Sequence, residues 1–151
     1  MEPSARATLV FEARELLADM ERALLALEAS GGSGELINAA FRAAHTIKGS
    51  AGLFELELIT SFTQMLENVL ERFRAGQLQL DAEFVSLLLS CCDYLSALVD
   101  AIEREAEQED PNPALRAELL ERLAVLAPQR TAAATLARGA GFTDFLRAEF
   151  T

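Results

Sequence analysis

The sequence has no tryptophan, one histidine and only two cysteines among its 151 residues. The cysteines, Cys91 and Cys92, are adjacent, and on a helix their side chains point about 100° apart, a poor geometry for a mutual bridge. Neither a disulfide framework nor a zinc-binding CxxC pair is predicted. We expect two reduced, buried thiols, as in a cytoplasmic protein.

Positive charge is also scarce, because 13 lysines and arginines face 24 aspartates and glutamates, a formal net charge of −11. Nucleic-acid binding needs a basic surface, so we expect protein partners and no nucleic acid. No signal peptide is predicted at the N-terminus. The apolar stretch 84–102 contains Asp93 and Asp100, which are costly inside a membrane. We therefore predict a core helix there and no membrane insertion.

Runs of β-branched residues are absent, whereas alanine, leucine, glutamate and arginine dominate, a composition that favours an all-α fold. Apolar residues recur at spacings of three, four and seven, the pattern of helices with one buried face. We predict long helices over about 4–29, 35–54, 57–75 and 82–108, with inward residues of the second at Ile37, Ala40, Ala44, Ile47, Ala51 and Phe54.

Capping and turn residues separate these predicted helices. The loop SGGSG ends the first helix, Gly76 lies where a C-terminal glycine is favoured, and Asp81 can cap the fourth helix. Asn112 and Pro113 begin a fifth helix that reaches about residue 126. One or two residues separate the second and third helices, so these two form an antiparallel hairpin.

This pattern predicts an up-down four-helix bundle with an appended fifth helix over residues 1–128. Residues 129–151 are expected to be a tail or linker. The alternative for this segment is a short helix packed on the bundle through Phe142, Phe145 and Phe150.

The only histidine lies in FRAAHTIKGSAGLF, residues 41–54. Helical spacing places Arg42, His45, Lys48, Gly49 and Gly52 on one side, opposite the apolar stripe. A glycine inside a helix costs about 1 kcal/mol relative to alanine. An approaching protein would benefit from the clearance at Gly49. Gly52 could serve the same purpose or let the helix pass close to its neighbour.

An imidazole near its ordinary pKa is a good nucleophile at neutral pH and can form a phosphoramidate. Lys48, one turn away, could pair with an anion carried on the ring. Antiparallel packing sets His45 level with about residue 66, between Gln64 and Glu67. A carboxylate there could accept a hydrogen bond from Nδ1–H and leave the Nε2 lone pair facing outward. We expect Glu67 in this role.

Two other chemistries do not fit. A metal site lacks a second histidine and carboxylates at ligand spacing. A serine hydrolase would need a nucleophile elbow and a strand to carry it.

The segments AAHTIKGSAG (43–52) and MLENVLERFRAGQLQL (65–80), followed by the helix with Leu87 and Asp93, resemble the N-terminal histidine phosphotransfer domain of CheA-type chemotaxis kinases. The resemblance covers about residues 5–126. It implies that an ATP-binding kinase domain phosphorylates His45 on Nε2, and that a CheY-like response regulator receives the phosphoryl group on an aspartate. Lys48 would support that group, Gly49 would give access and Glu67 would orient the ring.

Two positions depart from the family pattern. Gln64 stands where a second histidine is common, and it can form hydrogen bonds but cannot titrate. The stretch GLFELELI (52–59) lacks a further glycine near the turn, so we expect a slightly altered helix connection. No nucleotide-binding segment follows residue 127, so we expect the chain to be part of a larger kinase.

On this interpretation the domain is a cytoplasmic, monomeric carrier in two-component signalling that binds no cofactor itself, while its kinase uses ATP. Two alternatives stay open. The chain could be a stand-alone phosphorelay protein, or a helical interaction module without covalent chemistry, although the second leaves His45 and Gly49 unexplained.

Overall fold

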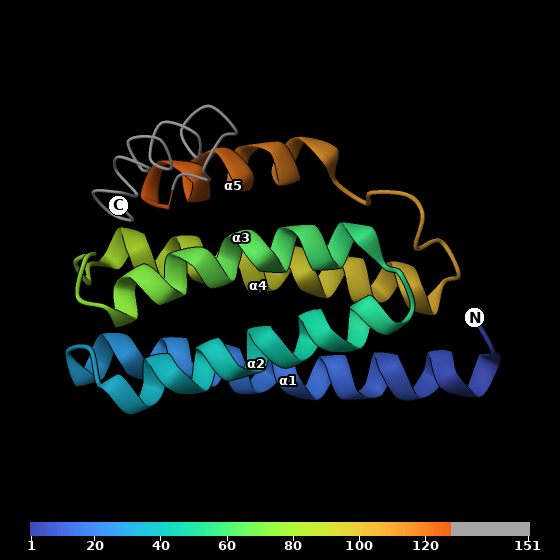
Figure 1. Cartoon of the computed structure of the whole chain (residues 1–151), viewed down its shortest axis with the longest axis horizontal. Coiled ribbons are helices and arrows are strands. Elements are labelled where there is room, and N and C mark those ends of the chain that lie inside the picture. The colour runs from blue at the N-terminus through green and yellow to red at the C-terminus, as the bar shows by residue number, and fades with distance from the viewer. Residues whose placement is uncertain (128–151) are drawn as a thin grey trace, which may run out of the picture.

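The computed structural model describes residues 1–127, which form five helices and no strand (Figure 1). The helices are α1 (Pro3–Ser30), α2 (Gly34–Leu53), α3 (Glu57–Arg74), α4 (Ala82–Glu103) and α5 (Pro113–Leu126). This arrangement confirms the predicted all-α bundle with an appended fifth helix. The prediction for residues 129–151, with its helix through Phe142, Phe145 and Phe150, lies outside the described residues.

The first four helices run up and down, and each lies beside two others of the bundle. α1 contacts α2 and α4, while α3 contacts α2 and α4 and closes the ring. α5 packs on α3 and α4, on the side away from α1 and α2 (Figure 1). The face of α2 that carries His45 therefore stays uncovered by α5.

Two helices begin where the predicted capping residues lie. The Asp81 carboxylate accepts a hydrogen bond from the backbone N–H of Phe84 at 2.7 Å. The Asn112 side chain accepts one from the N–H of Leu115 at 3.1 Å. Each cap satisfies a backbone donor that the helix itself leaves free.

The first four helices are each followed by a residue in the left-handed backbone region. Gly31 (φ 77°) follows α1, and Gly76 (φ 79°) follows α3, as predicted. Glu55 (φ 54°) and Glu105 (φ 60°) hold that position after α2 and α4. The N–H of the next residue then bonds back into the helix, as from Leu56 to a carbonyl of α2 at 3.0 Å. This is the Schellman pattern, which usually uses glycine.

Glutamate, and not glycine, occupies two of these positions, so the sequence pattern did not indicate where α2 and α4 end. The fourth helix was expected to reach residue 108 but ends at Glu103, because Glu105 already has the left-handed turn. The second ends at Leu53, and three residues rather than one or two join it to α3. Phe54, expected to face inward, is 38% exposed because it lies past the helix end.

α4 contributes more buried residues to the core than any other helix within residues 1–127. It is the one helix within residues 1–127 that is long and apolar enough to span a membrane, but 61% of that window is buried inside the bundle. Cys91 and Cys92 are buried and unpaired by disulfide, as expected. Burial raises the pKa of the Cys92 thiol to about 12. Twelve residues of α4 are buried, as expected for a core helix.

A partly buried polar cluster fixes α5 to the bundle. The phenol of Tyr94, on α4, donates to Asp110 at 2.8 Å. Arg116, on α5, donates to the carbonyl of Leu58 and to the hydroxyl of Ser61, both at 2.8 Å. These bonds hold α5 on the outer side of α3, where it leaves the seam between α2 and α3 open.

Glu55→Gly should raise the free energy of unfolding by about 0.5–1 kcal/mol, because a left-handed conformation strains a residue with a Cβ more than glycine's extra chain entropy costs. Chemical denaturation would measure the change. Glu55→Ala is the matched control, since it removes the carboxylate and keeps the strain. An equal gain in both variants would contradict this explanation.

Candidate functional site

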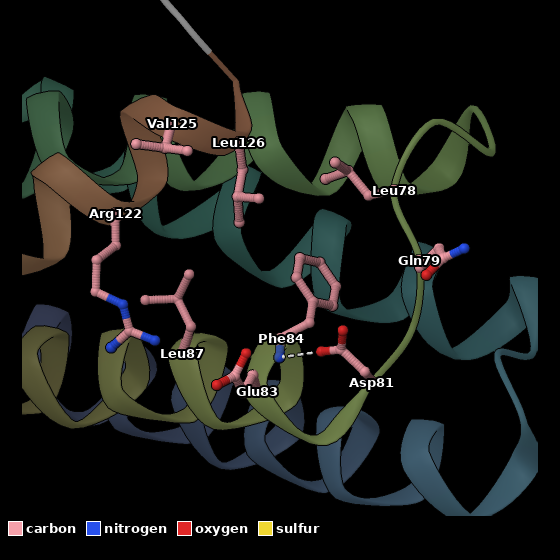
Figure 2. A pocket seen from close by; sticks show the side chains of 9 residues that line it. All are labelled: Leu78, Gln79, Asp81, Glu83, Phe84, Leu87, Arg122, Val125 and Leu126. Carbon is pink, nitrogen blue, oxygen red and sulfur yellow. Dashed lines mark hydrogen bonds between the residues drawn. The ribbon is translucent and has the colours of Figure 1, made fainter.

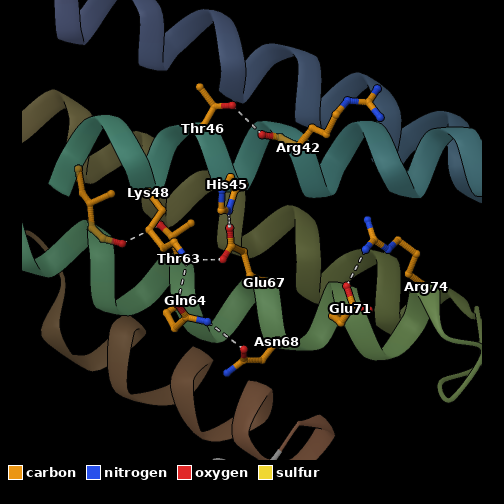
Figure 3. A network of polar contacts seen from close by, with 11 residues as sticks. Arg42, His45, Thr46, Lys48, Thr63, Gln64, Glu67, Asn68, Glu71 and Arg74 are labelled. Atoms are coloured by element: carbon orange, nitrogen blue, oxygen red, sulfur yellow. Dashed lines mark hydrogen bonds and ion pairs between the residues drawn. The ribbon is translucent and has the colours of Figure 1, made fainter. Parts of the chain in front are cut away.

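The candidate site lies on the seam between α2 and α3, halfway along the bundle (Figure 3). His45 projects from α2 with 65% of its side chain exposed, as predicted from the helical wheel. The Phe41 ring stacks beside the imidazole, with centroids 6.3 Å apart and planes 11° from parallel. The guanidinium of Arg74 lies over the Phe41 ring, 4.4 Å from its centroid.

Glu67, on α3, is the buried member of the site. Its side chain is only 6% exposed, and its Oε2 lies 2.8 Å from Nδ1 of His45. Because a carboxylate at neutral pH only accepts hydrogen bonds, Nδ1 must carry the proton. In the neutral ring the lone pair is then on Nε2. The predicted pairing of His45 with Glu67 is present in the structure.

Lys48 completes the ion pairing of this carboxylate. Its Nζ lies 2.6 Å from Oε1 of Glu67 and 2.9 Å from Oε1 of Gln64. An ammonium has three N–H donors, so these two bonds leave one donor for a further acceptor. Glu67 thus holds the imidazole with one oxygen and the ammonium with the other, and the pairing offsets the cost of its burial.

Gly49 lies on the same exposed face, one turn after His45. A Cβ added at Gly49 would meet nothing within 4 Å, so packing inside the domain does not require glycine there. At Gly52 an added Cβ would lie 4.0 Å from Cγ2 of Thr60, an ordinary contact. A close approach of α2 to its neighbour therefore does not explain Gly52 either.

Of the side chains predicted from sequence, His45, Lys48, Gln64 and Glu67 come together. Two neighbours of the site were not predicted: Phe41, which stacks on the imidazole, and Asn68, which accepts a hydrogen bond from Gln64 at 3.0 Å. Both lie four residues from a site residue on the same helix. That spacing is the signal that could have identified them.

A separate apolar groove of about 350 Å³ lies between the start of α4 and the end of α5 (Figure 2). Leu78, Phe84, Leu87, Val125 and Leu126 supply its apolar lining. The groove is not lined by any of the site residues His45, Lys48, Gln64 and Glu67. Within residues 1–127, no group of three potential metal ligands converges anywhere.

The model of the Hpt domain family matches residues 4–105, which is more than half of the chain. The chain therefore belongs to the Hpt domain family. Among its relatives is the chemotaxis protein CheA of Salmonella typhimurium, 40% identical over 102 residues, which are 68% of this chain and 15% of that protein. The CheA of Klebsiella aerogenes is 36% identical over 127 residues, 84% of this chain and 20% of the relative. The chain thus spans a fifth or less of their length.

Two solved structures are similar throughout the bundle. One is the phosphorylated P1 domain of CheA3 in complex with CheY6 from R. sphaeroides, with a TM-score of 0.71 and 25% identity over 83% of this chain and 100% of that one. The other is a histidine phosphotransfer domain of CheA, with a TM-score of 0.70 and 27% identity, covering 85% and 96%.

Glu67→Ala should allow the neutral His45 ring to populate both tautomers, because Nδ1–H loses the carboxylate that accepts its hydrogen bond at 2.8 Å. Long-range ¹⁵N–¹H NMR spectra of the neutral ring should show Nδ1–H in the wild type and a mixture in the variant. Glu71→Ala, which removes a carboxylate on α3 that pairs with Arg74 instead, should leave the spectrum unchanged. A wild-type ring protonated on Nε2 would contradict this geometry.

Proposed function

We propose that this chain is a phosphoryl carrier in chemotaxis two-component signalling. His45 accepts a phosphoryl group from an ATP-dependent kinase domain and passes it to an aspartate of a CheY-like response regulator. The observation that carries the proposal is the exposed imidazole whose Nδ1 is held by a buried carboxylate. An outward Nε2 lone pair is the arrangement that a nucleophilic imidazole needs.

The transfer proceeds in two displacements. In the first, Nε2 of His45 attacks the γ-phosphorus of ATP, an N–P bond forms, the P–O bond to ADP breaks, and the ring becomes a cation that keeps its Nδ1 proton. Glu67 stabilises this cation through the same 2.8 Å contact. In the second, an aspartate oxygen attacks phosphorus, the N–P bond breaks, and the neutral imidazole returns with its lone pair on Nε2.

The other site residues have supporting roles. Lys48 supplies positive charge to the transferring phosphoryl oxygens, which are strong acceptors for charge-assisted hydrogen bonds. Gly49 keeps the approach to Nε2 clear of side chains, and Gln64 fixes Lys48 with a neutral amide. The contacts of Lys48 with Glu67 and Gln64 support the first and last of these roles, and the open space around Gly49 supports the second.

The relatives support the proposed partners. This chain spans a fifth or less of the two CheA proteins, and we infer that its phosphoryl donor is an ATP-dependent kinase domain of the CheA type. The similar P1 domain of CheA3 is in complex with CheY6, which supports a response regulator as the acceptor. We infer a monomeric cytoplasmic domain that binds no cofactor of its own. A module without covalent chemistry would leave the His45–Glu67 pair without a role.

His45→Gln should abolish phosphorylation, because an amide offers no nucleophilic nitrogen lone pair. Incubation of the domain with ATP and a CheA-type kinase core should give an acid-labile, base-stable phosphate on the wild type only. Addition of a CheY-like protein should then remove the label. An unlabelled wild type, or equal label on both proteins, would reject the carrier function.

Substitution of Gly49 tests the access of a partner to His45 separately from folding stability, and the first variant is Gly49→Ala. The substitution should stabilise the domain by about 1 kcal/mol, because alanine is the better helix former and its Cβ meets no atom within 4 Å. The bulkier Gly49→Gln should slow phosphorylation by the kinase core without lowering the melting temperature below that of the wild type. Unchanged phosphorylation in Gly49→Gln would show that this position does not control access.

A further inference from the structure

Asn68 lies outside the set of residues that hold the imidazole, yet it is joined to them through Gln64. Both residues are on α3, four positions apart and thus one turn from each other. Nε2 of Gln64 donates to Oδ1 of Asn68 at 3.0 Å, and Oε1 of Gln64 accepts from Nζ of Lys48 at 2.9 Å (Figure 3). The Gln64 amide therefore bridges Asn68 and the ammonium.

The two ends of this amide are not equivalent. An ammonium has donors and no acceptor, so only the amide oxygen can face Lys48. Rotation of the Gln64 amide by half a turn would place its NH₂ group against the ammonium and replace an attraction with a repulsion. The favourable orientation presents the NH₂ group to Asn68, where the Oδ1 acceptor satisfies it. Asn68 thus stabilises the orientation of Gln64 that holds Lys48.

Holding Lys48 has a physical effect because its side chain is long and rich in rotamers. Glu67 supplies one acceptor to Nζ at 2.6 Å. Gln64, on the preceding turn of α3, supplies the second at 2.9 Å. Two acceptors from different turns restrict the position of Nζ, and they leave its third N–H for a further acceptor. The side chain of Lys48 is 25% exposed, so it remains open to an approaching group.

We propose that Asn68 and Gln64 form a positioning pair that fixes Lys48 beside His45 and so speeds the transfer of the phosphoryl group. This role rests on the proposed carrier function of His45. Asn68 acts on the lysine only through the orientation of Gln64. It follows that Asn68 should no longer affect Lys48 when residue 64 is a glutamate, because either carboxylate oxygen can accept from the ammonium.

The test compares Asn68→Leu and Asn68→Asp in two backgrounds, the natural Gln64 and the variant Gln64→Glu. Leucine removes the acceptor at nearly constant size, whereas aspartate keeps it. With Gln64, Asn68→Leu should lower the maximal rate of His45 phosphorylation by about two- to tenfold, the range for one lost hydrogen bond. Asn68→Asp should stay within about twofold of wild type. In the Gln64→Glu background, Asn68→Leu should change the rate by less than about twofold, because both carboxylate oxygens accept.

The order of the Lys48 side chain gives a readout that does not depend on phosphorylation. NMR relaxation at its Cε should show greater mobility in Asn68→Leu and wild-type mobility in Asn68→Asp and in the double variant Asn68→Leu/Gln64→Glu. A wild-type protein that takes up no phosphate would reject the carrier function. The mobility of Lys48 would then still show whether Asn68 and Gln64 fix this side chain. Thermal unfolding of each variant verifies that the bundle is intact.

Three results would overturn the proposal. Unchanged Lys48 order in Asn68→Leu would show that the pair does not fix the lysine. An equal loss of rate in both backgrounds would mean that Asn68 acts through the stability of α3 and not through the Gln64 amide. Increased Lys48 mobility with an unchanged rate would show that its fixed position does not matter for the transfer.

Discussion

The site depends on one buried carboxylate. Glu67 is 6% exposed, and an ionised carboxylate at that depth is unfavourable unless partners compensate for its lost hydration. His45 and Lys48 supply this compensation from the neighbouring helix. The same two contacts determine which ring nitrogen carries the proton and where the ammonium lies. Packing of α3 against α2 therefore sets both the tautomer of the ring and the position of the ammonium.

The register of the α2–α3 hairpin places these partners opposite each other. The contact pairs His45–Glu67 and Lys48–Gln64 are both symmetric about Leu56, the last residue of the connection, and Lys48 lies one turn nearer to it than His45. The left-handed residue Glu55 sets this connection and the backbone bond from Leu56 back to α2. α5 packs on the outer side of α3 and α4. The bundle thus provides a rigid seam and leaves the imidazole accessible.

The sequence predicted the bundle, the exposed face of His45 and the level of its partner, because helical periodicity and a short connection determine all three. It did not distinguish the environment of Glu67 from that of Gln64, since both share a polar stripe. Burial of Glu67 depends on how closely the two helices pack, which periodicity does not encode. The end of α4 was placed too late because Glu105 adopts a conformation that favours glycine. Asn68 was not predicted although it lies four residues from Gln64, because the same spacing also relates many surface residues that share no site.

Charge balance explains why one carboxylate serves both partners in the proposed transfer. A ring that attacks phosphorus must be neutral, because it needs the Nε2 lone pair, and Lys48 then compensates the charge of Glu67 at 2.6 Å. Once Nε2 carries the phosphoryl group, the ring becomes a cation and compensates Glu67 itself through Nδ1. The ion pair between Lys48 and Glu67 then contributes less, and the ammonium becomes available to the phosphoryl oxygens. A neutral amide at Gln64 suits this exchange, because it holds Lys48 without adding a second negative charge that would compete with the phosphoryl group.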